Sequence, residues 1–115
     1  MENLELWEEI KKTKRVLEGA LSQLQERGFA LNEAERKYKV AKAKRILALK
    51  SEGYPATLLS DIVMGEEEVS QLRLERDNSE VVYKSCLEGI NGYKVTIRIL
   101  DNKYSREWGQ AKQGG

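Results

Sequence analysis

Apolar residues recur every seven positions along both halves of the chain. In the first half this series starts at Ile10 and continues to Tyr38, and alanines stand three positions after several of its members. In the second half two such series run between Val69 and Tyr104. Apolar spacings that alternate between three and four form a seam along one face of a helix, and a strict seven-residue repeat winds that seam around a partner. The pattern therefore predicts two long helices that pack against each other.

A break in the pattern separates the two halves. Gly53 suits the left-handed backbone that follows a helix end, and Pro55 fixes a backbone angle that opens a new helix. The apolar cluster at 58–63 provides one or two helical turns, which Gly65 ends. We predict a single all-α domain, 1–115, folded as a long antiparallel, coiled-coil-like helical hairpin. Its parts are helix one at about 3–51, a turn with a short helix at 52–65, helix three at about 66–109 and a flexible tail at 110–115.

Glycines interrupt both predicted long helices. Gly28 suits a helix end, and Asn91-Gly92 is the strongest short signal for a two-residue β-hairpin turn. The seven-residue register nevertheless passes both places without a slip, which a loop or a pair of strands would not preserve. We therefore predict continuous helices, with a hairpin of strands as the alternative around Asn91-Gly92.

Composition narrows the classes of function. The chain has 20 basic and 19 acidic residues and a net charge of +1, so no strong overall attraction to nucleic acid or membranes is expected. No apolar run of about 18 residues could span a bilayer, and the N-terminus begins acidic where a secretion signal needs basic residues. We expect a cytoplasmic protein with no membrane contact.

Motifs for catalysis and metal binding are missing from the sequence. It has no histidine to act as a base or a zinc ligand. Its single cysteine, Cys86, falls on the seam, where we expect a buried structural thiol. The acidic residues around 61–68 lack the alternation and central glycine of a calcium loop. We therefore expect no enzyme activity, no cofactor and no metal site.

Basic residues concentrate between positions 36 and 50, where no acidic residue occurs. At about 100° per residue they spread over most of a helix circumference, which is typical of a solvated helix, with a phosphate-binding strip as the alternative. Arg45 occupies a seam position, so we expect a carboxylate such as Glu75 or Glu80 across from it, with an anion site as the alternative. The candidate nucleic-acid or anion contacts are Arg36, Lys37, Lys39, Lys42, Lys44, Arg45 and Lys50.

A second apolar face lies beside the basic stretch. Val40, Ile46 and Leu47 belong to it, and either the short helix or another subunit must cover it. One pair of long helices cannot shield all such flanking side chains, so we predict a homo-oligomer with Trp108 as a further interface residue. Tyrosines of the second half should pack opposite alanines of the first, with an aromatic platform for single-stranded bases as the alternative.

Four segments of the chain resemble small uncharacterised helical proteins of phages and prophages of Gram-positive bacteria, which are encoded in early regions near recombination and replication genes. The resemblance spans residues 30–108, implies a phage accessory protein and assigns no site residue. It leads us to expect a non-catalytic protein that acts by protein–protein interaction, as an oligomeric adaptor or an inhibitor of a host protein. The alternative is a nucleic-acid-binding accessory factor for phage recombination or replication that uses the basic stretch. The segments are Tyr38-Lys39-Val40-Ala41-Lys42-Ala43-Lys44, Glu52-Gly53-Tyr54-Pro55-Ala56-Thr57-Leu58, Val69-Ser70-Gln71-Leu72-Arg73, and the ending from Arg98-Ile99-Leu100 through Arg106-Glu107-Trp108.

Overall fold

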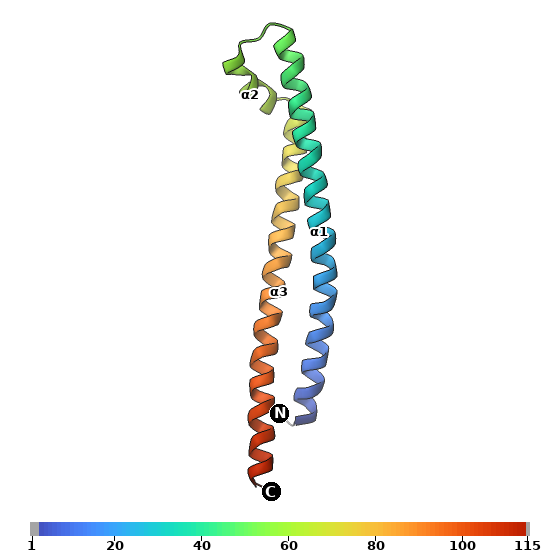
Figure 1. Cartoon of the computed structure of the whole chain (residues 1–115), viewed down its shortest axis with the longest axis vertical. Coiled ribbons are helices and arrows are strands. Elements are labelled where there is room, and N and C mark those ends of the chain that lie inside the picture. Colours follow the sequence, from blue (N-terminus) through green and yellow to red (C-terminus); the bar gives the residue numbers. More distant parts are fainter. Residues whose placement is uncertain (1–2, 115) are drawn as a thin grey trace. The chain divides into compact units, whose positions relative to one another are not determined.

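The protein is represented by a computed structural model that describes residues 3–114, with side chains described for residues 3–109. Helix α1 spans Asn3–Ser51, the short helix α2 spans Ala56–Met64, and helix α3 spans Glu67–Gly114 (Figure 1). No strand occurs among the residues described. The predicted all-α class, with a short helix between two long helices that pack together, is confirmed.

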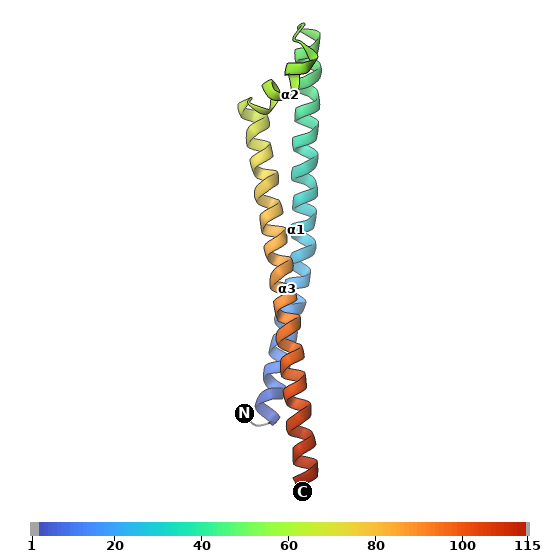
Figure 2. The same cartoon turned by 90° about the vertical axis from the view of Figure 1, so that its left-hand side faces the viewer.

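The chain divides into two compact units, and each contains one stretch of α1 and one stretch of α3. Unit 1 takes α1 up to Gln25 and α3 from Ser85 onward, and unit 2 comprises residues 26–84. Within unit 2, α1 and α3 run antiparallel, and α2 lies at the end where the chain reverses (Figure 2). The basic stretch and the turn therefore belong to unit 2.

The seam of unit 1 is narrow. Leu6, Ile10 and Ile90 are buried there, as the seven-residue pattern indicates. Thr13, which is also buried, donates its hydroxyl to the carbonyl oxygen of Glu9 at 2.8 Å. This bond satisfies the polar atom inside the helix, so the threonine can occupy a seam position without stranding a buried group.

Other contacts across unit 1 correct two details of the predicted packing. The ring of Tyr104 lies 5.9 Å from that of Trp7 at an angle of 37°, so this tyrosine packs against an aromatic side chain and not against an alanine. Cys86 is half-buried where full burial was expected. Its Sγ lies 3.7 Å from the carbonyl oxygen of Ala20, which places the thiol beside the backbone of α1.

The core of unit 2 includes α2. Leu59 and Val63 stand four residues apart on one face of this short helix and are buried. They join Tyr38 and Leu49 of α1 and Val69 at the start of α3 in one hydrophobic cluster. The short helix thus closes one side of the α1–α3 pair.

The chain reversal depends on one glycine. Gly53 has a φ of 91°, the left-handed conformation that the sequence predicts after α1. The N–H of Gly53 donates to the oxygen of Lys50 at 3.1 Å, and the N–H of Tyr54 donates to the oxygen of Leu49 at 3.2 Å. These two bonds satisfy the last carbonyl groups of α1 as a Schellman motif does. Pro55 then precedes the first residue of α2, also as predicted.

Both long helices are continuous through their glycines. α1 passes Gly28 and α3 passes Asn91-Gly92, so the helical prediction is confirmed and the strand hairpin is wrong. A Cβ built on Gly28 would lie 3.5 Å from Cε2 of Tyr83, so the small residue opposite this tyrosine is a glycine and not an alanine. α3 continues to Gly114, beyond the predicted end at 109. The side chains of 110–114, and Gly115, lie outside the described residues.

Candidate functional site

Some cations of the basic stretch of α1 form salt bridges with carboxylates about one helical turn earlier. Arg36 donates from Nε and Nη2 to the carboxylate of Glu33, at 3.0 Å and 2.6 Å. These hydrogen bonds hold the pKa of Glu33 below its usual value, so the pair stays ionised near neutral pH. Lys39 Nζ lies 3.3 Å from an oxygen of Glu35. Both cations are therefore partly neutralised within α1, which weakens any phosphate strip built on them.

Tyr38 is a packing centre and not a stacking platform. The Arg76 guanidinium lies 4.7 Å from its ring centroid, and Lys42 Nζ lies 5.9 Å from it. The Tyr38 hydroxyl donates to the sulfur of Met64 at 3.0 Å. Arg76 also donates from Nε to Asp77 at 3.0 Å. Because the Tyr38 side chain is buried, no base could stack on this ring without opening the core of unit 2.

Arg45 pairs with Glu66, and the prediction of Glu75 or Glu80 as its partner is wrong. Arg45 Nε lies 3.0 Å from both oxygens of Glu66, and Nη2 lies 2.8 Å from one of them. The carboxylate also raises the pKa of the guanidinium, mainly through these hydrogen bonds. The Arg45 side chain is 39% exposed, so the pair lies at the edge of the seam and not inside it.

The helix register explains why the expected partners were wrong. Glu75 adjoins Arg76, which lies level with Tyr38 of α1, and Tyr38 precedes Arg45 by seven residues. Seven residues span about 10 Å of helix, which is beyond the reach of a salt bridge. Glu66 lies just before α3 begins, so the geometry of the turn decides which carboxylate reaches Arg45. Arg27, a further seam arginine, is exposed to solvent.

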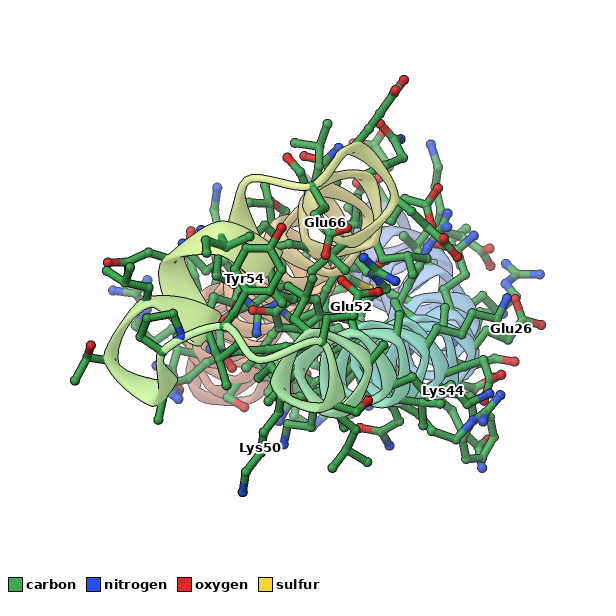
Figure 3. All side chains as sticks on the ribbon, turned by 90° about the horizontal axis from the view of Figure 1, so that it is seen from above. Glu26, Lys44, Lys50, Glu52, Tyr54 and Glu66 are labelled. Atoms are coloured by element: carbon green, nitrogen blue, oxygen red, sulfur yellow. The ribbon has the colours of Figure 1, made fainter. Side chains whose placement is uncertain are left out.

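Four lysines of the stretch remain without a salt bridge in the described part of the chain: Lys37, Lys42, Lys44 and Lys50. Figure 3 shows Lys50 projecting away from α3, while Glu52 and Glu66 lie on the side where α1 faces α3. Glu52 adds to the field that favours the charged form of Arg45. Lys37 and Lys44 share one side of α1, whereas Lys50 projects from another, so the stretch is not one continuous phosphate-binding strip.

The predicted partner-interface residues separate into covered and uncovered ones. Ile46 is half-buried against the core of unit 2, whereas Val40 and Leu47 remain 40% and 66% exposed. α2 therefore covers one flank of the second apolar face and leaves the other open. Trp108, in unit 1, is about half exposed and interacts with neighbouring residues.

An apolar stripe follows the solvent-facing side of α1 in unit 2. It consists of Phe29, Val40 and Leu47, which we call the outer stripe, and all three are exposed. Spacings of eleven and seven residues keep them on one helix face, opposite the seam residue Tyr38. Arg36 lies between them along that face, and other lysines of the basic stretch border it. Large apolar side chains in such a row are typical of a surface that binds another protein.

A second surface lies to one side of the α1–α3 pair of unit 2, where two shallow depressions cross between the helices. Sequence reasoning missed the α3 residues that line them. Glu68 and Val82 belong to one seven-residue series that follows the seam of α3, and this spacing was the available signal. One depression is lined by Arg27, Ala30, Asn78, Ser79 and Val82, and the other by Arg36, Lys37, Val40, Ala41, Lys44, Glu68 and Leu72.

No catalytic constellation emerges in residues 3–109. Among these side chains, no three carboxylates or thiols come together in a way that could hold a metal ion. Within the described helices, none has the length and apolar character needed to cross a bilayer.

Comparison with known proteins gives no relative: no family model, no curated protein and no solved structure matches the chain.

Proposed function

We propose that the chain is a non-catalytic accessory protein that acts by binding other proteins through the outer stripe. The supporting observation is the exposure of Phe29, Val40 and Leu47 on a helix whose seam is already filled by α2 and α3. An apolar row in water is unfavourable until a partner covers it, at about 25 cal/mol for each Å² buried. The resemblance to phage and prophage proteins supports the role of an adaptor or of an inhibitor of a host protein.

The charges that border the outer stripe define the chemistry of the partner. Lys44 and Lys50 flank Leu47 and form no salt bridge among the described residues. A partner that presents apolar side chains within an acidic rim would gain burial and charge complementarity together. We therefore propose an acidic, apolar protein surface as the ligand of the outer stripe.

Nucleic-acid binding is the competing function. Phosphate binding by this stretch would draw on cations that Glu33, Glu35 and Glu66 already neutralise in part. Of the remaining lysines, Lys37 and Lys44 share one side of the helix and Lys50 lies on another, so few of them could follow one phosphate backbone. These features favour a protein ligand over DNA or RNA.

The test compares wild type with Leu47→Glu in capture from a lysate of a Gram-positive bacterium, with and without nuclease treatment. Leu47→Glu places a carboxylate at the C-terminal end of the outer stripe and should remove the specifically captured protein, because an acidic partner would meet a desolvated like charge. Val81→Glu on α3 is the matched control, since Val81 is 63% exposed, similar to Leu47, and lies on the other helix.

Two results would contradict this function. If Leu47→Glu and Val81→Glu retain the same captured protein as wild type, the outer stripe is not the binding surface. If the captured material is nucleic acid that nuclease and high salt remove, the basic stretch binds phosphates instead.

A further inference from the structure

The side face of unit 2 places a row of positive charge beside a row of negative charge. On α1, Ala30, Lys37 and Lys44 follow each other at seven-residue intervals, and all three line the two depressions described above. We call these residues the lysine row. Because each interval is close to two helical turns, the row stays parallel to the seam.

A matching row follows α3 on the same face. Glu68 lines the depression that contains Lys37 and Lys44, and Val82 lines the one that contains Ala30. Glu75 stands midway between Glu68 and Val82 in the same seven-residue series and therefore belongs to this face. We call these three residues the glutamate row.

The rows are separated by small side chains and are not neutralised by each other. Ala41 and Ser79 line the depressions between them, so the face is shallow and another helix pair can approach it closely. Within the described residues, no salt bridge involves the two lysines or the two glutamates of the rows. The face thus presents two unpaired, opposite lines of charge with apolar contacts beside them.

We infer that this face binds a second copy of the chain, with both copies of unit 2 pointing in the same direction around a two-fold axis parallel to their helices. This inference goes beyond the proposed function, since it concerns a second surface and names the partner that this surface binds. Such an axis places each lysine row over the glutamate row of the other copy. It also places Ala30 level with Val82 of the other copy, so a small residue meets an apolar one at one end of the face.

The alternative two-fold axis, running across the helices, is disfavoured by the same residues. It would place lysine row over lysine row and glutamate row over glutamate row, and like charges across an interface are repulsive. It would also bring Val82 opposite Glu68 of the other copy, which leaves an apolar side chain against a carboxylate. Charge and apolar pattern therefore favour the same orientation.

The size of the face fits a reversible dimer. The stretches from 27 to 44 and from 68 to 82 are about 25 Å long, and two helices side by side are about 20 Å wide. A contact of that size buries about 1,000 Å² in total, near the lower limit for a specific interface. Since much of the complementarity is charge, the dimer should weaken as salt is added.

Charge reversal tests the pairing of the rows. Lys37→Glu with Lys44→Glu makes the charged positions of both rows acidic, and Glu68→Lys with Glu75→Lys makes them basic. Each double variant alone should sediment at the monomer mass of 13.2 kDa, whereas wild type should approach twice that mass. An equal mixture of the two variants should recover the dimer, because each acidic row then meets a basic one. Recovery in the mixture also demonstrates that both variants fold.

The control applies the same charge change outside the face. Lys39→Glu with Lys50→Glu lies in the same basic stretch of α1 but outside the lysine row, and it should leave the dimer intact. A wild-type chain that stays at 13.2 kDa at high concentration would overturn the inference. So would a dimer that persists in both double variants of the rows.

Cross-linking tests the orientation. In a Cys86→Ser background, Ala30→Cys in one copy and Val82→Cys in another should form a disulfide between chains when mixed and oxidised. In the alternative orientation Ala30 lies opposite Lys44 of the other copy, so a cross-link from Ala30→Cys to Lys44→Cys would contradict the parallel arrangement.

Failure of this inference is distinguishable from failure of the proposed function. If the chain is monomeric but Leu47→Glu still abolishes capture of a protein, the second copy is wrong and the outer stripe stands. If the dimer forms as described but Leu47→Glu changes nothing, the side face stands and the outer stripe is wrong.

Discussion

Individual residues of this chain differ most in the backbone geometry that they must adopt. Gly19 and Gly53 both have open space around a hypothetical Cβ, but Gly53 alone of the two has a positive φ, at 91°. Crowding therefore cannot explain either glycine. Gly53 is required by the turn, whereas Gly19 lowers the stability of α1 without a steric reason.

We predict opposite effects of alanine at these two positions. Gly19→Ala should stabilise the protein by about 1 kcal/mol, because alanine is the better helix former. Gly53→Ala should destabilise it by about 1 kcal/mol, because an L residue is strained in the left-handed region. Chemical denaturation of the two variants measures both changes. Equal shifts in the same direction would contradict the backbone explanation.

Arg45 is a second residue whose role depends on its surroundings. Because Glu66 is its partner and both side chains are partly exposed, removing one charge does not strand the other in a dry core. Arg45→Ala should lower the melting temperature at low salt, and this loss should shrink at high salt. Glu66→Gln should have the same effect, and the double variant should be no less stable than either single one. Thermal melts at two ionic strengths measure this, and a loss that does not change with salt would show a buried pair instead.

At the scale of elements, α2 is the helix whose contribution is most local. Leu59 is 5% exposed within the core of unit 2, whereas the adjacent Leu58 is 49% exposed. Both neighbours are leucines of the same helix, but their side chains differ in burial. Substituting each of them in turn therefore separates the contribution of packing to the stability of α2 from the contribution of helix propensity.

Leu59→Ala should destabilise unit 2 by about 3 kcal/mol, because it removes buried methyl groups and leaves a cavity beside Tyr38 and Val69. Leu58→Ala should change stability by less than about 0.5 kcal/mol, since the exposed side chain loses little on truncation. The free energies of unfolding of both variants, measured by denaturant titration, test this. Similar losses in the two variants would show that α2 does not pack through Leu59.

The element boundaries were largely predictable from sequence because two independent signals agree in the turn. Gly53 has a positive φ after α1 and Pro55 precedes the first residue of α2, whereas Gly65 follows α2 with a φ of −87° that any residue could adopt. Continuity through Asn91-Gly92 was also predictable, since the seven-residue register outweighs a two-residue turn signal. Local sequence and periodic burial therefore fix the helices of this fold.

The candidate site was less predictable, because it depends on the register between α1 and α3. Periodicity identifies the seam but does not say which residues lie level across it, and so it predicts Glu75 or Glu80 opposite Arg45 in place of Glu66. The exposure of Leu47 and the cover of Ile46 depend on where α2 packs, which the turn alone does not determine. The basic stretch was recognisable in the sequence. The carboxylates that partly neutralise it were not.

At the scale of the whole molecule, the two units differ in what stabilises them. Unit 2 has a third helix and a five-residue buried cluster. Unit 1 has Gly19, Gly89 and Gly92 within its helices, and none of these glycines has a neighbouring atom within 4 Å of a hypothetical Cβ. Each such glycine lowers helix stability by about 1 kcal/mol.

We therefore predict that unit 1 opens before unit 2. Amide hydrogens around Ala20 and Ile90 should exchange faster than those around Leu49 and Val69, because local opening follows the smaller packing energy of unit 1. Hydrogen exchange followed by mass spectrometry resolves these segments. Uniform exchange, or slower exchange in unit 1, would contradict this order of stability.

We propose that this chain binds protein and not nucleic acid, and a gel shift with single- and double-stranded DNA at two salt concentrations distinguishes the two. Since Arg36, Lys39 and Arg45 are already paired with carboxylates, we expect at most weak binding at low salt and none at physiological salt. Tight binding that falls steeply between the two salt concentrations would show that the basic stretch neutralises phosphates, and would contradict a protein ligand for this surface.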